Sequence, residues 1–155
     1  MKGSYILVLQ LERPLVGLRV GRLGSFDFAP GYYLYVGSAR GPGGLEARLA
    51  HHLRRHKARP HWHIDYLRAE ARLREAWTVA GDDPVECVWC RALRANQAIS
   101  APVPGFGSRD TRCAGHLFYL HRAPHPSLLT GVILGAALAE GRAELLLEIH
   151  SFDDG

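Results

Sequence analysis

Tyrosine, glycine and cationic residues lie close together in the sequence between residues 33 and 57. Tyr33 and Tyr35 alternate with apolar residues, Gly37 follows them, and Arg48 begins a stretch rich in histidine and arginine. Hydrolysis of a phosphodiester needs a base beside a water and a cation near the phosphate, often with a carboxylate that holds a divalent metal. Strand tyrosines and helix arginines are also common as packing residues and as a solvated face. The segment therefore allows phosphodiester chemistry without requiring it.

A second chemistry is suggested by the cysteines. The segments CVWC and CAGH place Cys87, Cys90, Cys113 and His116 in two pairs with the same internal spacing. Thiolates and imidazole are the ligands that Zn²⁺ prefers in structural sites. Cysteine is also among the most buried residue types, so packing in the core is the competing interpretation.

The segment HWHID adds three more titratable side chains, His61, His63 and Asp65, at alternating positions. His63 and Asp65 alternate with apolar residues, and an imidazole beside a carboxylate could ligate a metal or relay protons. The alternative is structural, with both side chains tying the start of a helix to its neighbours. The sequence leaves both roles open.

These side chains need a scaffold, and the first third of the chain predicts a sheet. Residues 4–11 are apolar on both alternating faces, which is typical of a central strand. Residues 15–24 predict a second strand that turns back on the first, and residues 32–37 predict a third. We therefore expect a small antiparallel sheet.

A helix is predicted directly after the glycine-rich loop. Leu45, Leu49 and Leu53 recur at every fourth position and mark its buried face. The residues along one flank of this stripe are Arg48, His52 and Arg55, with His51 beside them. A cationic ridge would thus border the buried face.

The rest of the chain alternates between helix and strand patterns. Helices are predicted at 63–76, at 82–98 with Asp83 as N-cap, and at 126–141. The inner face of the middle helix would carry Val85, Val88, Trp89 and Ala92. Strands are predicted at 77–81 and 116–123, and the pattern of residues 143–152 fits either type. The whole predicts an α+β fold with a small central antiparallel sheet flanked by helices.

Composition limits the class of protein. The chain has 155 residues, 47% apolar content and a net charge of +4, which suits one domain over residues 1–155 and a polyanionic partner if the charge is concentrated. The N-terminal segment is typical of a strand and not of a signal peptide, so we expect a cytoplasmic, reducing setting. The apolar stretch 128–139 is too short to cross a bilayer, so no membrane partner is expected. Oligomeric state is left open.

Several short motifs resemble a known family. GSY at 3–5, YVG at 35–37 and RLAHH from Arg48 resemble the GIY-YIG endonuclease superfamily. GYYLYVGSA, HWHIDYL, VEC, GFGSRD and CAGHLFYL more closely resemble its Uri-type branch. The resemblance runs from Gly3 to Leu120 and marks 121–155 as a C-terminal extension. It implies metal-dependent hydrolysis of phosphodiester bonds in DNA, with DNA repair as one setting.

The resemblance also implies roles for individual residues. Tyr5 and Tyr35 would provide the base or orient the attacking water, and Arg48, with His52 one turn later, would stabilise the phosphate. Glu86 would bind one Mg²⁺ or Mn²⁺. Residues 15–26 would be an insertion between the two tyrosine motifs. The residues expected to contact nucleic acid are Gly37, Ser38, His51, Arg55 and Lys57, and an additional site could include His63, Asp65, Asp110 and His116.

Glu86 has a second interpretation. It lies three residues after Asp83, which is the capping-box position and the positive end of the predicted helix. Metal ligand and helix cap therefore both stay open. At the level of the whole protein, the alternatives to a nuclease are a non-catalytic nucleic-acid-binding domain and a zinc-stabilised interaction domain.

Overall fold

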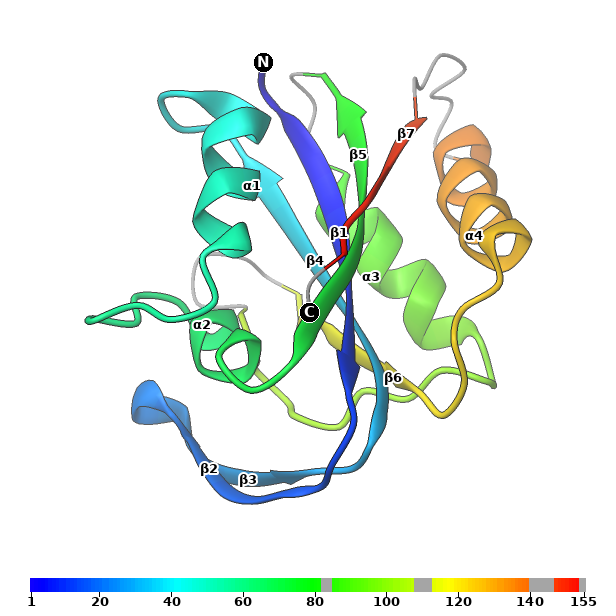
Figure 1. Ribbon diagram of the computed structural model, residues 1–155. Helices are drawn as coiled ribbons and strands as arrows, with labels where there is room; N and C mark the ends of the chain where they lie inside the picture. Colours follow the sequence, from blue (N-terminus) through cyan, green and yellow to red (C-terminus); the bar gives the residue numbers. More distant parts are fainter. Residues whose placement is uncertain (82–84, 108–112, 140–146, 154–155) are drawn as a thin grey trace.

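A five-stranded antiparallel sheet is the centre of the computed structural model, which describes residues 1–81, 85–107, 113–139 and 147–153 (Figure 1). The strand order is β6-β4-β1-β5-β7, so β1 is central, as predicted. The strands are β1 (Gly3–Leu11), β4 (Gly31–Ala39), β5 (Arg72–Ala80), β6 (Leu117–Leu120) and β7 (Leu147–Ser151). The α+β prediction is confirmed.

The segment between β1 and β4 forms a separate two-stranded sheet. Its strands are β2 (Leu15–Val20) and β3 (Gly24–Phe28), joined by a single 3-10 turn. In Figure 1 this hairpin extends from one end of the main sheet. Because the hairpin loops out, β1 and β4 still pair directly, with Tyr5 opposite Gly37 and Leu7 opposite Tyr35.

Helices cover both faces of the main sheet. One face packs against α1 (Gly44–Leu53) and α2 (His63–Arg68), and its buried side chains include Leu7, Leu45 and Ile64. The other face packs against α3 (Glu86–Ala95) and α4 (Pro126–Ala139), with Trp77 and Trp89 among its core residues. Alternation along β1 sends successive side chains into the two cores, which explains why this strand is apolar throughout.

Two predicted helices differ from the observed ones in their ends or in their buried face. The helix predicted at 63–76 ends at Arg68, because residues from Arg72 onward pair with β1 as part of β5. The structure starts α3 at Glu86, with Val85 at the N-cap position, while Asp83 lies outside the described residues. On α3, Val85 and Trp89 are buried as predicted, but Cys90 and Leu93 are buried in place of Val88 and Ala92.

The buried face of α1 is also different at its C-terminal end. Leu45 is buried and Leu49 is partly buried, but Leu53 is 43% exposed. His52 takes the inward position instead, because its ring bonds to Tyr5 below it. The prediction that His52 belongs to a cationic ridge beside the buried face was therefore wrong, because His52 lies in the buried face itself.

The C-terminal segment joins the same sheet. Residues 147–151, whose pattern fitted either type, form β7 and pair with β5 at the edge. Within the described residues, no helix has the length and apolarity needed to cross a bilayer.

Candidate active site

Residues from four separate elements line one cavity of about 450 Å³. Strand β1 supplies Tyr5, β4 supplies Tyr35, α1 supplies Arg48, and the first residue of α3 is Glu86. The other lining residues are Val36, Gly37, Ser38, Arg40, Trp62, Gly107 and His116. Three of the four residues with implied catalytic roles and the implied metal ligand Glu86 thus converge, whereas His52 is not among the lining residues and reaches the site through Tyr5.

The sheet topology explains how both helical layers reach this cavity. Strand β6 pairs with β4 only from Tyr32 to Tyr35, and the Val36 amide then donates to the His116 carbonyl at 3.0 Å. In the described residues, Gly37 and Ser38 continue β4 beyond that point and line the cavity. Glu86, on the α3 side of the sheet, and Arg48, on the α1 side, therefore meet around the end of β4.

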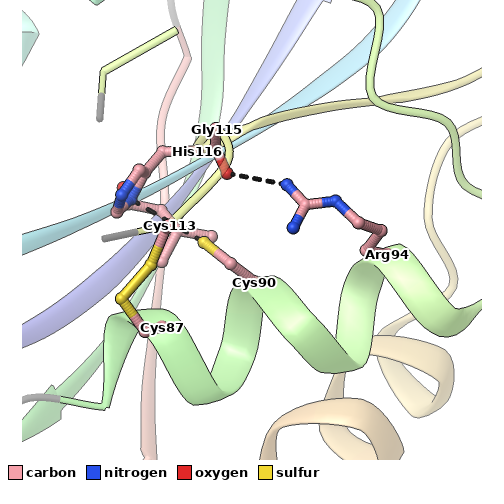
Figure 2. The surroundings of a disulfide bond; sticks show 7 residues. Cys87, Cys90, Arg94, Cys113, Gly115 and His116 are labelled. Atoms are coloured by element: carbon pink, nitrogen blue, oxygen red, sulfur yellow. Dashed lines mark hydrogen bonds between the residues drawn. A yellow bond between two sulfur atoms is a disulfide. The ribbon is translucent and has the colours of Figure 1, made fainter. Parts of the chain in front are cut away.

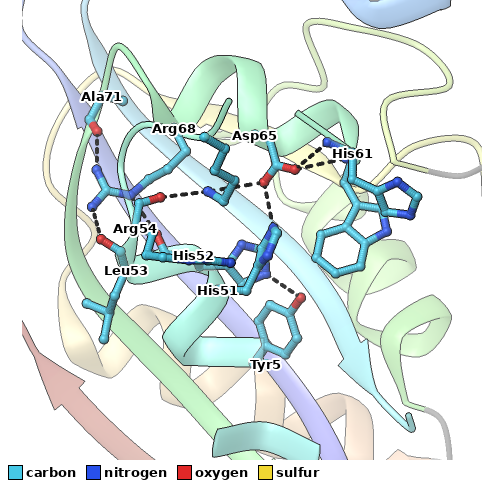
Figure 3. A network of polar contacts seen from close by, with 11 residues as sticks. Tyr5, His51, His52, Leu53, Arg54, His61, Asp65, Arg68 and Ala71 are labelled. Atoms are coloured by element: carbon cyan, nitrogen blue, oxygen red, sulfur yellow. Dashed lines mark hydrogen bonds and ion pairs between the residues drawn. The ribbon is translucent and has the colours of Figure 1, made fainter. Parts of the chain in front are cut away.

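Tyr5 is held in place by packing and by one hydrogen bond. Its hydroxyl lies 2.8 Å from His52 Nε2, and only 2% of the residue is exposed (Figure 3). A Cβ on Gly37 would come within 2.5 Å of the Tyr5 ring and hydroxyl, so the ring lies directly over this glycine. Burial, assisted by the neighbouring Tyr35, raises the pKa of Tyr5 well above its ordinary value, while Arg48 opposes the shift. Tyr5 is therefore a neutral phenol near pH 7.

Tyr35 lies on the same face of the sheet, one strand away. It is 8% exposed, and Gly107 packs close to its ring. Burial raises the pKa of Tyr35 and the charge of Arg48 partly offsets this. Both tyrosines thus present neutral hydroxyls, which can donate or accept a hydrogen bond.

His52 is a buried neutral imidazole. It is 1% exposed, and burial followed by the neighbouring His51 lowers its pKa to about 3. Nε2 faces the Tyr5 hydroxyl, and Nδ1 has no hydrogen-bond partner among the described residues. His52 Nε2 can therefore donate a hydrogen bond to the Tyr5 hydroxyl or accept one from it, depending on the tautomer of His52.

Arg48 is oriented by an aromatic ring. Its guanidinium carbon lies 4.3 Å from the centroid of Trp62, within the range of a cation–π interaction. Trp62 also contacts His51 edge-on, with ring centroids 4.4 Å apart. Arg48 remains partly exposed at the cavity, so its charge is available to an anionic ligand.

Glu86 places a carboxylate in the cavity. It is the first residue of α3, so it is not at the third helical position that the capping-box interpretation required. The α3 N-cap has no side-chain hydrogen bond, and no hydrogen bond or ion pair of Glu86 is found within the described part of the chain. The metal-ligand interpretation is therefore compatible with the structure, and Asp83, the other member of the capping box, lies outside the described residues.

Three of the side chains expected to contact nucleic acid bind within the protein. His51 Nε2 lies 3.0 Å from Asp65 Oδ1, and Lys57 Nζ lies 3.4 Å from the same oxygen. Arg55 donates to the Ala69 carbonyl at 3.2 Å. Of the five residues expected to contact nucleic acid, Gly37 and Ser38 line the cavity.

Asp65 is the centre of a buried polar network (Figure 3). His51 and Lys57 contact Oδ1, and Oδ2 accepts the amides of His61 at 2.9 Å and Trp62 at 3.0 Å. Burial alone would raise the pKa of Asp65, but these amides, the hydrogen bond from His51 and the charge of Lys57 lower it below the ordinary value. Asp65 thus has the structural role that was predicted for it, because it ties the start of α2 to its neighbours.

A possible metal site includes the same carboxylate. His51, His52 and Asp65 have ligand atoms within 4.8 Å of one another, so this group could hold a metal.

His63 supports the far wall of the cavity. Its Nδ1 accepts the Gly107 amide at 2.8 Å, and its ring packs against Phe106. This bond fixes the loop that contacts Tyr35. Asp110, in the same predicted loop, lies outside the described residues.

The cysteines differ from the zinc arrangement that the sequence suggested. Cys87 and Cys113 form a disulfide, and Cys90 keeps a free buried thiol (Figure 2). Three thiolates are therefore not present together in this state. Cys90, Cys113 and His116 nevertheless have potential ligand atoms within 4.8 Å of one another, so the group could hold a metal.

Sequence reasoning missed Arg40, Trp62 and Gly107 as cavity residues. Trp62 carried a usable signal, because it lies between the two histidines of HWHID. Arg40 and Gly107 are in glycine-rich loops, where turn chemistry explains the residue types without a ligand.

The cavity lies inside the part of the chain that matches a family model. The model is described as "Domain of unknown function DUF123" and matches residues 4–134. No curated protein and no solved structure matches the chain. Because the match covers far more than half of the chain and includes every cavity residue named above, the chain belongs to the DUF123 family.

Proposed function

We propose that this protein is a metal-dependent endonuclease of the GIY-YIG type, Uri branch, that hydrolyses phosphodiester bonds in DNA. A role in DNA repair in the cytoplasm is the setting that we expect for it. One observation carries the proposal: Tyr5, Tyr35, Arg48 and Glu86, assigned from separate motifs, line a single cavity. If the short motifs resembled the family only by chance, there would be no reason for these four residues to line the same cavity.

Glu86 fits a hard divalent cation. A single carboxylate on a helix N-terminus, open to the cavity, suits Mg²⁺ or Mn²⁺, which keep several waters and bind few protein oxygens. When bound there, the metal would supply positive charge to the scissile phosphate and the leaving oxygen. Glu86 would hold it at the end of β4, opposite Arg48.

Arg48 binds and orients the phosphate. The Trp62 ring restricts the guanidinium, so its charge is directed at the cavity before substrate enters. A preorganised cation of this kind stabilises negative charge that grows on phosphate oxygens in the transition state.

The tyrosines and His52 handle the attacking water. The neutral hydroxyl of Tyr35 can hold a water or a phosphate oxygen by a hydrogen bond. Tyr5 can donate its hydroxyl hydrogen to His52 Nε2, 2.8 Å away, while its oxygen accepts a hydrogen bond from the attacking water and orients it. Because burial disfavours both a phenolate at Tyr5 and an imidazolium at His52, the pair would orient the water, and the proton of the water would pass to a phosphate oxygen or to solvent in the cavity.

The test is cleavage of a defined set of substrates by the full chain. Branched, nicked and single-stranded DNA and a matched RNA would be incubated with Mg²⁺, with Mn²⁺ or with a chelator. The proposal expects cleavage of at least one DNA that stops when the chelator is added. Absence of cleavage on all substrates with either metal would overturn it.

A non-catalytic nucleic-acid-binding domain is the second candidate. The observation in its favour is that Tyr5 and His52 are both shifted away from titration near pH 7, whereas many general bases are tuned toward it. This candidate predicts DNA affinity that falls steeply with salt and no cleavage. The same substrate set, analysed for binding as well as cleavage, separates the two.

A further inference from the structure

We propose that Cys87, Cys90, Cys113 and His116 bind one zinc ion when the cysteines are reduced, so that this centre has two alternative states, zinc-bound and disulfide-bonded. The inference does not rest on nuclease activity, since none of the three cysteines is among the residues that line the cavity. The sequence shows only that the two pairs have the same spacing, whereas the structure brings the two pairs together.

The fold brings ligand atoms of Cys90, Cys113 and His116 within 4.8 Å of one another, and Cys87 is bonded to Cys113 (Figure 2). Cys87 and Cys90 are three residues apart on α3 and so lie on one side of the helix, one turn apart. His116, the residue before β6, places Nδ1 3.7 Å from Cys90 Sγ. Ligands of a tetrahedral zinc site are about 3.7 Å from one another, given zinc–sulfur bonds of about 2.3 Å.

Burial of the group suits a structural metal. His116 is 2% exposed, and the Nδ1 that faces Cys90 also lies 3.0 Å from the Val36 carbonyl, a contact that Nδ1 would exchange for the metal. Three thiolates, a neutral imidazole and Zn²⁺ carry one net negative charge. Arg94, also on α3, donates to the Gly115 carbonyl beside the group and supplies a compensating cation.

Zinc and the disulfide exclude each other. A metal needs thiolates, and the sulfur of Cys113 cannot be a thiolate while it is bonded to Cys87. Reduction of this bond by a dithiol frees two thiolates, which can then separate and join Cys90 and His116 around the metal. In both states Cys87 stays tied to Cys113, so the start of α3 is tethered to the segment before β6.

A small-molecule disulfide can serve as the oxidant that converts the zinc-bound state to the disulfide-bonded state. One of the two thiolates attacks the oxidant, forms a mixed disulfide and releases one small thiolate. The other thiolate then attacks the mixed disulfide, forms the Cys87–Cys113 bond and releases the second small thiolate. Two electrons pass from the protein to the oxidant, and Zn²⁺ leaves to water.

The first experiment measures metal content in the two redox states. The full chain would be reduced with a dithiol, loaded with Zn²⁺ and desalted, and half would then be oxidised with glutathione disulfide. We expect about one zinc per chain in the reduced sample and loss of zinc in the oxidised sample. A reduced protein without zinc, or an oxidised protein that keeps it, would overturn the proposal.

A second measurement identifies the ligands. Co²⁺ in place of zinc should give the visible bands of tetrahedral coordination and the near-ultraviolet band of thiolate ligation in the reduced wild-type protein. Cys90→Ser and His116→Asn should each weaken metal binding by about 100-fold or more, whereas His121→Asn, on the exposed turn after β6, should bind like wild type.

If a variant fails to fold, the cobalt spectrum of the wild-type protein still tests whether thiolates bind the metal. Octahedral cobalt without a thiolate band would contradict the inference in the wild-type protein itself. Since neither experiment uses nucleic acid, failure here and failure of the proposed nuclease are distinguishable.

Discussion

The hydroxyl of Tyr5 and Nε2 of His52 lie 2.8 Å apart, although 46 residues separate them in the sequence. The bond joins the central strand to the last turn of α1 beneath the helix, where both residues are shielded from water. It explains why His52 and not Leu53 occupies the inward position. It also links the proposed water-handling tyrosine to a group whose protonation depends on pH.

Burial of His52 should make stability fall in mild acid. Its folded pKa is about 3 and its unfolded value is near 6.5, so between these values the unfolded chain binds more protons. The contribution is complete above pH 6.5 and is lost as pH falls, by about 2 kcal/mol between pH 7 and pH 5. Urea unfolding at both pH values measures it.

The matched variants isolate His52 from the other histidines. His52→Gln should show a smaller loss of unfolding free energy between pH 7 and pH 5 than the wild-type protein, by about the same 2 kcal/mol. His121→Gln, at an exposed position, should keep the wild-type difference. An unchanged pH dependence in His52→Gln would show that this histidine is not buried in its neutral form.

Gly37 should tolerate no side chain. A Cβ there would meet the Tyr5 ring and hydroxyl, which must shift and weaken the bond to His52. We expect Gly37→Ala to lower the free energy of unfolding by about 1–3 kcal/mol. Gly41→Ala is the control, because a Cβ at Gly41 meets nothing within 4 Å. Equal stability of the two variants would contradict the packing of Tyr5 on Gly37.

Asp65 should matter for stability more than for chemistry. Asp65→Ala removes the acceptor of the His61 and Trp62 amides and leaves Lys57 without its carboxylate, so a loss of about 3 kcal/mol is expected. Thermal or urea unfolding checks it, with the exposed Asp153→Ala as control. A loss no larger than that of the control would mean that the network does not stabilise the start of α2.

Arg48 should be needed for turnover. Arg48→Ala removes the cation held over Trp62 and should lower the DNA cleavage rate by about 100- to 1,000-fold, the range seen for loss of one preorganised charge or donor. Circular dichroism would confirm that the variant is folded. Arg122→Ala, an exposed cation after β6, should cleave at the wild-type rate. Similar rates for the two variants would remove Arg48 from the site.

The strands and the cavity were more predictable than the helix ends. Apolar alternation in residues 4–11 predicted a central strand, and β1 is central because both of its faces are covered. The segment 63–76 has helical spacing, but its second half pairs with β1. Long-range pairing of this kind leaves no mark on local periodicity.

The internal partners of the cationic residues could not be predicted from spacing. A helical wheel places His52 on the flank of the leucine stripe with His51 beside it, but the tertiary contacts of His51 with Asp65 and of His52 with Tyr5 are not visible in the spacing. Likewise, two-residue spacing suggested a cysteine set, but only the folded chain shows that Cys87 reaches Cys113. The convergence of Tyr5 and Glu86 followed from motif resemblance and not from periodicity.

The most direct test of the nuclease proposal is the single-turnover rate of DNA cleavage with Mn²⁺ for three proteins: wild type, Glu86→Gln and Glu70→Gln. Glu70 is an exposed carboxylate after α2 that is not among the cavity residues. The account predicts Mn²⁺-dependent cleavage by wild type and Glu70→Gln, and a rate at least about 100-fold lower for Glu86→Gln. A wild-type protein that does not cleave, or a Glu86→Gln protein that cleaves as fast as Glu70→Gln, would contradict it.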